Sequence, residues 1–156
     1  MKRNGLIKKI IHYIYLPIQL MQLKMHKKVI VLFGTEDLGN YGDQHIALSE
    51  LEFLHYYFKD YYIMEVPATS VLRRKSLLNY KFDHNVILFS QGGGNLGDQY
   101  LLGERMRHLA ISLHPENQYF IFPQTVYYKD EDGEWMRKDK IAFNGNAKVH
   151  LFIREQ

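Results

Sequence analysis

The chain alternates short apolar runs with longer segments in which apolar residues recur at helical spacing. The runs Val-Ile-Val-Leu-Phe, ending at Phe33, and Val-Ile-Leu-Phe, ending at Phe89, are continuous, as in strands covered on both faces of a parallel sheet. Expected strands cover Lys28–Phe33, Tyr61–Val66, Val86–Ser90, Tyr119–Phe122 and Lys148–Ile153. Expected helices cover Gln44–Phe58, Thr69–Tyr80 and Gln99–His114, and Asp130–Phe143 is a further candidate although it contains Gly133.

The order of these elements predicts an α/β protein. Strands that alternate with helices form a parallel sheet with right-handed crossovers and helices on both faces, a Rossmann-like arrangement. The first of the expected helices should bury Ile46, Leu48, Leu51, Leu54 and Phe58. At 156 residues the chain is long enough for one compact core. We expect a basic amphipathic helical segment over residues 1–26 and a Rossmann-like domain over residues 27–156.

The N-terminal segment has two interpretations. Its apolar residues at helical spacing are Ile7, Ile10, Ile11, Ile14, Ile18 and Met21. With Lys8 and Lys9 beside them, they suit a helix that lies on an anionic membrane surface. The same pattern suits a helix packed on the domain's own flank or on a partner. Charged and polar residues interrupt the apolar stretch and no small-residue cleavage site follows, so neither a transmembrane helix nor a cleaved signal peptide is expected.

Composition narrows the function classes. The chain has no cysteine, which excludes disulfides, zinc–cysteine sites and thiol catalysis. A reducing compartment agrees with this, so we expect a cytoplasmic location, with the inner face of the plasma membrane as the surface available to residues 1–26. The net charge is +3, and the first 28 residues hold seven basic residues and no acidic one, so the remainder is slightly acidic. No nucleic-acid partner is expected.

A hexapeptide occurs twice. Gly-Asn-Tyr-Gly-Asp-Gln at Gly39–Gln44 returns as Gly-Asn-Leu-Gly-Asp-Gln at Gly94–Gln99, and each copy is expected to follow a strand and open a helix. Glycine lets the backbone approach a ligand, and the free N–H groups at a helix start favour an anion. We therefore expect the two loops to lie side by side at the carboxyl edge of the sheet and to form one crevice.

Two nucleotide-binding motifs fit poorly. The glycines that begin at Gly92 satisfy G-x-G-x-x-G, but the next expected strand ends without the acidic residue that would hold a ribose. A nicotinamide enzyme is therefore disfavoured. Gly34 and Gly39 have the spacing of P-loop glycines, yet Asn40 and Tyr41 stand where Lys and Ser or Thr would hold phosphate and magnesium, which excludes a P-loop nucleotidase.

The aspartates of the two hexapeptides, Asp43 and Asp98, are expected at helix starts. One interpretation makes them ordinary N-caps, because Asp is among the best capping residues. The other makes them acceptors for sugar hydroxyls or part of a loop scaffold, with Asn40 and Asn95 supplying amides. Repetition of the whole hexapeptide favours a role beyond capping.

Four blocks of residues resemble the polysaccharide pyruvyl transferase family. In the family's order, the blocks are Gly39–Gln44 leading into Ala47-Leu48, Gly92–Asp98, Phe122-Pro123-Gln124-Thr125 and Phe152-Ile153-Arg154-Glu155. The resemblance covers Lys28–Gln156, roughly the first half of a usual member. It implies one half of a two-domain fold like that of the glycosyltransferase-B enzymes, with a cleft between the halves.

The resemblance also implies a reaction. Members transfer the enolpyruvyl part of phosphoenolpyruvate to a sugar and form a pyruvate ketal on an exopolysaccharide or cell-wall glycan. The expected partners are phosphoenolpyruvate and a glycan or lipid-linked sugar acceptor, and neither a metal nor another cofactor is expected. The expected substrate-binding residues are Gly39, Asn40, Gly42, Asp43, Gln44, Gly92, Gly93, Gly94, Asn95, Gly97, Asp98, Gln124 and Arg154.

The family's second half supplies most of its basic residues and the histidine implicated in handling phosphoenolpyruvate, and the present chain ends at Gln156. The resemblance therefore implies a fragment, a truncated gene product or a partner chain that supplies the second half. The catalytic residues are expected in that half, and no activity is expected in this chain alone. The alternative is a non-catalytic sugar-binding or assembly subunit of a polysaccharide biosynthesis system.

Few other residues change this picture. The eight histidines form no convincing metal pair, and His45, beside the first hexapeptide, is the one candidate proton carrier. Arg105 and Arg107 are expected to face solvent, whereas Arg154, after a strand's carboxyl end, is placed to meet an anion or to form a surface ion pair. The tyrosines placed to line the crevice are Tyr41, Tyr100, Tyr127 and Tyr128.

Overall fold

A computed structural model describes residues 16–36, 39–71 and 77–154 of the chain. Within these ranges, residues 16–25 are helical. The elements that follow are β1 (Val29–Thr35), α2 (Tyr41–Tyr57), β2 (Tyr62–Pro67), α3 (Ala68–Val71), the 3₁₀ turn η1 (Leu77–Asn79), β3 (Ile87–Ser90), β4 (Gly93–Gly97), α4 (Leu101–Leu113), β5 (Tyr119–Tyr127), α5 (Glu134–Asn144) and β6 (Val149–Ile153).

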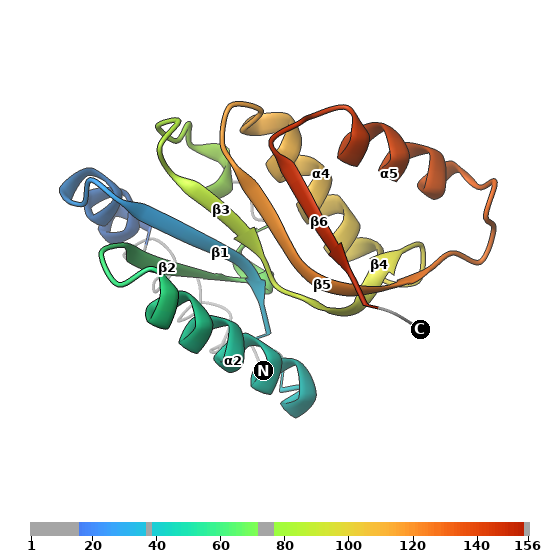
Figure 1. Ribbon diagram of the computed structural model, residues 1–156, viewed down its shortest axis with the longest axis horizontal. Helices are drawn as coiled ribbons and strands as arrows, with labels where there is room; N and C mark the ends of the chain where they lie inside the picture. Colours follow the sequence, from blue (N-terminus) through green and yellow to red (C-terminus); the bar gives the residue numbers. More distant parts are fainter. Residues whose placement is uncertain (1–15, 37–38, 72–76, 155–156) are drawn as a thin grey trace, which may run out of the picture.

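The described strands form one parallel sheet. β1 lies between β2 and β3, and β5 pairs with β3 through Leu88 and Tyr119. β4 continues the line of β3 and pairs with the carboxyl-terminal part of β5, while β6 pairs with the other edge of β5. Figure 1 shows the strands side by side, with α2 on one side of them and α4 and α5 on the other. The Rossmann-like parallel sheet with helices on both faces is thus confirmed.

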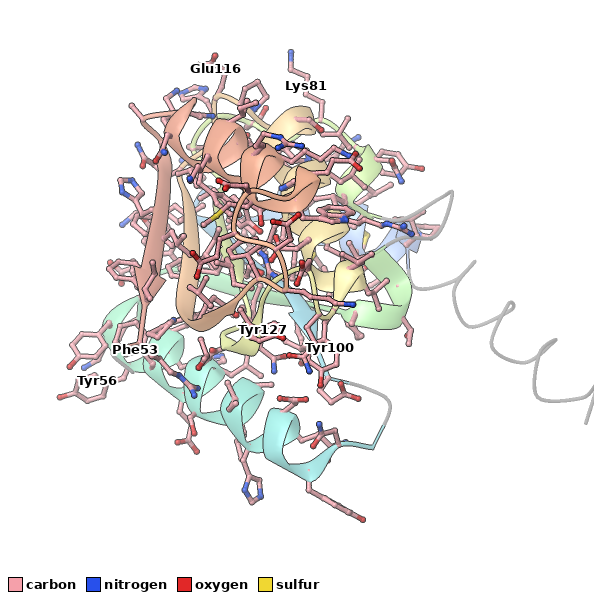
Figure 2. The ribbon with its side chains drawn as sticks, turned by 90° about the vertical axis from the view of Figure 1, so that its right-hand side faces the viewer. Phe53, Tyr56, Lys81, Tyr100, Glu116 and Tyr127 are labelled. Atoms are coloured by element: carbon pink, nitrogen blue, oxygen red, sulfur yellow. The ribbon has the colours of Figure 1, made fainter. Side chains whose placement is uncertain are left out.

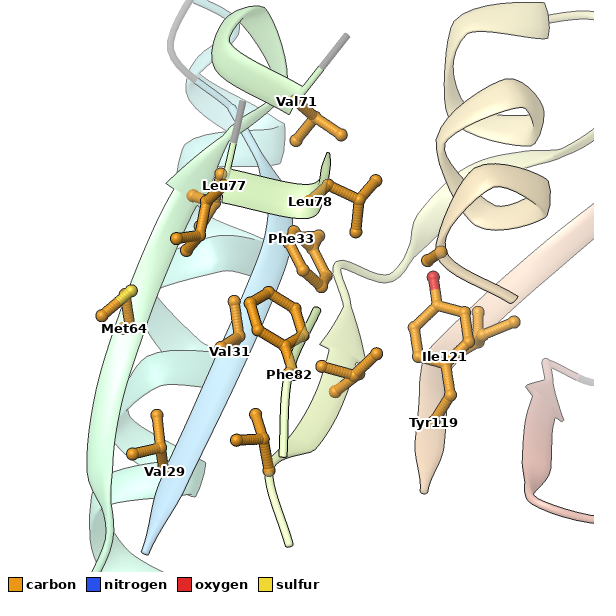
Figure 3. Close-up of a cluster of buried hydrophobic side chains, with 14 of the residues drawn as sticks. Val29, Val31, Phe33, Met64, Val71, Leu77, Leu78, Phe82, Tyr119 and Ile121 are labelled. Atoms are coloured by element: carbon orange, nitrogen blue, oxygen red, sulfur yellow. The ribbon is translucent and has the colours of Figure 1, made fainter. Parts of the chain in front are cut away.

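The side chains fill the two faces of the sheet unequally. The larger cluster packs alternate strand residues such as Val31 and Phe33 against Leu78, Phe82 and the helices of one face, and Figure 3 shows these side chains together. The smaller cluster lies beneath α2, where Leu54 meets Ile30, Leu32 and Phe89. Figure 2 turns the molecule and shows α2 set apart from α4 and α5. The strand alternation explains both clusters, because successive residues of one strand point to opposite faces.

Several expected elements differ from the structure. Within the described ranges the sheet has six strands rather than the five expected, because Gly93–Gly97, expected as a loop, forms β4. β5 does not end at Phe122: it runs through Pro123 to Tyr127, and the ladder with β6 shifts register between Ile121 and Gln124. Proline cannot donate to a ladder, which agrees with this irregularity. The helix expected over Thr69–Tyr80 is replaced by α3 and η1, and residues 72–76 between them lie outside the described ranges.

The described part of the N-terminal segment packs on the body of the protein. Leu16 is buried, and Leu20 and Leu23 pack against the larger cluster. Ile18 and Met21, which belong to the predicted apolar stripe, remain 45% and 51% exposed. No helix among the described residues is long and apolar enough to cross a membrane. Residues 1–15 lie outside the described ranges, so the membrane-surface interpretation and the boundary at residue 26 stay predictions.

Candidate functional site

The segments that follow β1 and β3 meet at one edge of the sheet. β1 and β3 are adjacent and parallel, so both lead to the same edge. The Gln91 side-chain amide donates to the Asp43 carbonyl at 3.0 Å. A Cβ on Gly93 would lie 3.9 Å from Asp43 Oδ1, so the Asp43 carboxylate stands over the glycine backbone. The first hexapeptide thus lies against Gln91 and Gly93, just before the second hexapeptide and at the predicted edge of the sheet. A crevice shared by the two hexapeptides stays a prediction.

The first hexapeptide opens α2, but Asn40 rather than Asp43 provides the cap. Asn40 Oδ1 accepts the Gly42 N–H at 3.1 Å, and Asn40 Nδ2 donates to Asp43 Oδ2 at 2.6 Å. Asp43 lies in the first turn, where its charge complements the positive end of the helix. Of the two interpretations of Asp43, the one that makes it the N-cap is wrong, because Asn40 occupies the position from which a side chain reaches the first free N–H groups.

The second hexapeptide does not open a helix. Its first residues belong to β4, and α4 begins at Leu101 with no side-chain cap at Tyr100. Asp98 accepts the Lys129 N–H with both carboxylate oxygens, at 2.9 and 3.0 Å. The expected helix-start role of Asp98 is thus wrong. The reason is tertiary: β5 extends far enough to pair with Gly93–Gly97, and this pairing uses backbone groups that a loop would leave free.

Glu50 is a buried carboxyl group that the sequence did not single out. It lies on α2 with 8% of its surface exposed, and its Oε1 accepts the Gly92 N–H at 2.8 Å. Its Oε2 is buried and has no partner among the described residues. Burial raises the pKa of the Glu50 carboxyl from 4.5 to about 7, and the Gly92 N–H and the positive charge of Arg154 offset part of this rise. Glu50 therefore exchanges a proton near neutral pH.

A second buried glutamate binds the other end of the glycine-rich segment Gly92–Gly97. Glu104 Oε1 accepts the Gly97 N–H at 2.5 Å and an N–H of the Arg107 guanidinium at 2.7 Å. Arg107 is 1% exposed, so the expectation that it faces solvent is wrong, whereas Arg105 is exposed as expected. A guanidinium is buried here because its carboxylate partner is three residues away on the same helix. The glycine-rich segment is thus anchored from α2 and from α4, on opposite faces of the sheet.

The carboxyl edge of the sheet, where Glu50 and Glu104 bind the glycine-rich segment, is rich in hydrogen-bond acceptors. Among the described residues, buried side-chain oxygens without a partner are found on Thr35, Gln91 and Gln124 as well as on Glu50. Such oxygens are completed by ordered water or by donors from a ligand. Gln124 is fully buried and its amide donates to the Gln91 carbonyl at 2.8 Å, so it links β5 to the end of β3.

The other predicted residues lie around this edge. Gly39 and Gly94 are exposed, Gln44 is half-buried, and no atom lies within 4 Å of a Cβ added at Gly94. The Arg154 N–H donates to the Gln124 carbonyl at 2.9 Å, which places the exposed Arg154 at the carboxyl end of β6 beside the same edge. The side chain of Asn95 lies outside the described part of the chain. Substrate binding by all of these residues stays a prediction.

The tyrosines separate into two groups. Tyr41, Tyr100 and Tyr127 are 79%, 56% and 53% exposed. Tyr128 instead donates its hydroxyl proton to Asp139 at 2.6 Å, and burial beside this carboxylate raises the pKa of the Tyr128 phenol. Tyr128 therefore belongs to a structural contact with α5.

An apolar cavity of about 730 Å³ lies between α2 and the sheet. Glu50 is among the lining residues, and the exposed His45 and Ser49 stand on the α2 side. The aromatic lining residues are Phe53, Phe58, Phe89, Phe120, Phe122 and Phe152. A cavity with such walls excludes a multiply charged ligand, because phosphate and carboxylate groups would lose their hydration without receiving partners.

One group of side chains has the composition of a metal site. The ligand atoms of Glu104, His108 and Asp139 lie within 4.8 Å of one another. Glu104 is already paired with Arg107, and Asp139 is bonded to His108 at 2.5 Å and to Tyr128. The group therefore works as a hydrogen-bond network that joins α4 to α5. The spacing of Glu104 and His108, one helical turn apart, was the sequence signal that could have revealed it.

Comparisons with known proteins agree with this geometry. The model of a family described as polysaccharide pyruvyl transferase matches residues 40–156. General stress protein 30 of Bacillus subtilis is 30% identical over 83% of this chain and 38% of its own length. Pyruvyl transferase 1 of Schizosaccharomyces pombe is 28% identical over 83% of this chain and 32% of its own length. The chain thus spans well under half the length of these relatives.

Proposed function

The chain belongs to the polysaccharide pyruvyl transferase family, and from this premise we propose that it provides the acceptor-sugar side of a pyruvyl transfer site. The donor is phosphoenolpyruvate, and the acceptor is a sugar of an exopolysaccharide or cell-wall glycan precursor, free or lipid-linked. The observation that carries the proposal is the position of Asp43, whose Oδ1 stands over Gly93 where the two hexapeptide regions meet.

The chemistry of this edge suits hydroxyl groups better than a phosphate. The half-buried Asp43 offers its carboxylate to a ligand, whereas the unpartnered side-chain oxygens of Gln91, Gln124 and Glu50 are buried. A sugar hydroxyl donates to such a carboxylate, whereas phosphate oxygens are repelled by it. Arg154 is the cationic group beside these acceptors, and it suits the carboxylate or phosphate of the donor at the rim.

The transfer balances with two hydroxyls of one sugar. A proton adds to the methylene carbon of phosphoenolpyruvate, which leaves an oxocarbenium-like carbon at the adjacent position. One sugar oxygen bonds to this carbon and loses its proton, phosphate then leaves with the electron pair of its C–O bond, and the second sugar oxygen takes its place with loss of its own proton. The protein must supply an acid for the first step and acceptors for the two hydroxyl protons. Asp43 is the acceptor that this chain offers.

We propose that the acid and most donor contacts come from polypeptide beyond this chain. The chain spans 38% of general stress protein 30 and 32% of pyruvyl transferase 1, so it offers one wall of a cleft. Groups on both sides of a reacting carbon must be prepositioned for catalysis, so the 156-residue chain alone should be inactive. Because the chain spans so little of its relatives' length, a second candidate function is a non-catalytic sugar-binding or assembly subunit.

We further propose a cytoplasmic location at the inner face of the plasma membrane. Residues 1–26 carry basic and apolar residues, and Ile18 and Met21 remain exposed on the helical part that the structure describes. Such a helix would hold the protein near lipid-linked acceptors.

The experiment compares two proteins. Phosphate release from phosphoenolpyruvate with a glycan acceptor is measured for the 156-residue chain, and for this chain joined to the region of pyruvyl transferase 1 outside its matched part. Release is expected only in the joined protein. There, Asp43→Ala should lower kcat/KM at least tenfold, while Asp60→Ala, at an exposed aspartate before β2, should not change it. Release by the short chain that depends on Asp43 would place the chemistry in this half and contradict the proposal. Sugar binding without release in either protein would favour the non-catalytic candidate.

A further inference from the structure

The two faces of the sheet are covered to different extents. On one face, residues 16–25, α3, α4 and α5 pack on the larger cluster. On the other face, α2 packs over Ile30, Leu32 and Phe89, and no further helix among the described residues covers β5 and β6. The cavity described above opens on this uncovered part. We call it the α2–β6 groove.

The walls of the groove are those of a protein interior. Phe120 and Phe122 project from β5, and Phe152, which is 51% exposed, projects from β6. Phe53 of α2 meets Phe122 edge to face, with ring centroids 5.8 Å apart. Parallel sheets are normally covered on both faces, and an exposed apolar surface of this kind marks the seat of another segment or protein.

We propose that the α2–β6 groove binds an apolar helix. This helix belongs to the second half of the family fold, the polypeptide that the relatives have beyond the part matched by this chain. The family match runs through β5 and β6, which form the groove floor, while the chain spans only 38% of general stress protein 30. A full-length relative thus has polypeptide available to cover the same strands. This inference rests on the proposed function, in which the second half of the family fold lies outside this chain.

The lining of the groove sets a requirement on the occupant. Glu50 is the one acidic residue among the lining residues, and its Oε2 is already shielded from solvent. The occupant therefore meets an almost wholly apolar wall, on which an unpaired polar group would lose its hydration. The helix should present apolar side chains to the phenylalanines.

The absence of cysteine from the chain allows a clean accessibility experiment. Ser49→Cys places a thiol on the groove side of α2, and Ser112→Cys places one on α4, on the opposite face. The two positions are matched: each serine is exposed and donates to a backbone carbonyl of the preceding helical turn, at 2.9 and 3.1 Å. The rate of labelling by a maleimide dye is measured for each variant, alone and with the region of general stress protein 30 outside its matched part.

The added polypeptide should slow labelling of Ser49→Cys at least tenfold and leave Ser112→Cys unchanged. Phe152→Asp should weaken the complex at least tenfold, whereas Ile141→Asp, at an exposed apolar residue of α5, should not. The same slowing of Ser49→Cys labelling is expected when the two polypeptides are joined in one chain. This joined protein tests binding in the groove even if the separate polypeptide does not fold.

Several outcomes overturn the proposal. One is the absence of a complex together with equal labelling of the two thiols in the joined protein. A second is protection of Ser49→Cys in the chain alone that dilution relieves, because a second copy then fills the groove. A third is protection that deletion of residues 1–15 relieves, because the chain's own N-terminal segment then fills it. Labelling does not depend on pyruvyl transfer, so an inactive but protected complex would reject the proposed function and retain the seat.

Discussion

Gly97 lies where a strand backbone passes very close to its neighbour. Its φ is +117°, a conformation that other residues rarely adopt, and a Cβ there would collide with the Tyr127 carbonyl. We expect Gly97→Ala to lower the free energy of unfolding by about 2 kcal/mol or more. The backbone strain at position 97 and the displacement of β5 by the added Cβ both contribute to this loss. Gly94→Ala is the control, because no atom lies within 4 Å of its Cβ position. Urea unfolding at neutral pH measures both, and an equal effect of the two variants would contradict the collision.

Glu50 makes the stability of the protein depend on pH. Its pKa is about 7 in the folded protein and 4.5 in the reference state, so the folded protein binds more protons between these values. The stability that Glu50 contributes is therefore present in full below pH 4.5 and is lost as the pH rises through 7. The loss amounts to at most roughly 3 kcal/mol.

The variant Glu50→Gln isolates this effect. Glutamine keeps an oxygen for the Gly92 N–H but does not ionise, and the other titrating groups are common to both proteins. Urea unfolding at pH 5, 6, 7 and 8 measures the free energy of unfolding of both proteins. The value for Glu50→Gln should rise relative to that of the native protein by up to roughly 3 kcal/mol as the pH rises. A difference that stays constant over this range would show that Glu50 does not titrate there.

At the scale of elements, the two hexapeptides show how one local sequence takes two structures. Gly39–Gln44 begins α2, whereas Gly94–Gln99 lies in β4 and the bend that follows. Both contain the same glycines, asparagine and aspartate, so local preference is the same. Pairing with β5 decides the second copy, and packing of α2 over β1 decides the first. Their meeting at one edge depends on the sheet and not on a shared conformation.

The helix at residues 16–25 packs on the body of the protein with one side and leaves its other side exposed. Leu16, Leu20 and Leu23 pack on the body, whereas Ile18 and Met21 are exposed. We expect the protein to co-sediment with anionic vesicles and not with neutral ones, because the basic residues of the first 28 add electrostatic attraction to an apolar contact. Ile18→Gln together with Met21→Gln should reduce the bound fraction, since both side chains lie away from the core. Equal binding to neutral and anionic vesicles would refute membrane attachment by this helix.

At the scale of the whole molecule, the two apolar clusters share the same strands. Ile30 and Val31 are neighbours in β1 and belong to clusters on opposite faces. A loss of packing beneath α2 should therefore also destabilise the other face. We expect Leu54→Ala, at a fully buried residue of α2, to lower the free energy of unfolding by roughly 2–5 kcal/mol. Urea transitions followed by circular dichroism and by fluorescence of Trp135, the single tryptophan, should coincide.

The control for this variant is Leu48→Ala on the same helix. Leu48 was expected to be buried but is 55% exposed, so its replacement should change stability by less than about 0.5 kcal/mol. If α2 melted first while Trp135 fluorescence stayed native, the two faces would be separate folding units and the shared-sheet interpretation would fail.

The sequence by itself determined the fold class and the order of most elements. Continuous apolar runs fix which segments can lie in the interior of a parallel sheet, and helical spacing fixes which segments can cover it, because both depend on residues close together along the chain. The same holds for the family, since its four blocks can be read in order. The first hexapeptide region and its position after β1 were predictable for this reason.

Only the tertiary structure decided the details of the site. Glu50 is 42 residues from Gly92, and Asp98 is 31 residues from Lys129, so nothing in the local pattern relates them. A glutamate on an amphipathic helix is ordinarily solvated, but Glu50 and Glu104 are buried where each accepts a glycine N–H from outside its helix, and Glu104 also pairs with Arg107. β4 likewise exists because β5 extends past Pro123. Local sequence sets what each segment can form, and pairing between distant segments sets which backbone groups, charges and cavities remain for function.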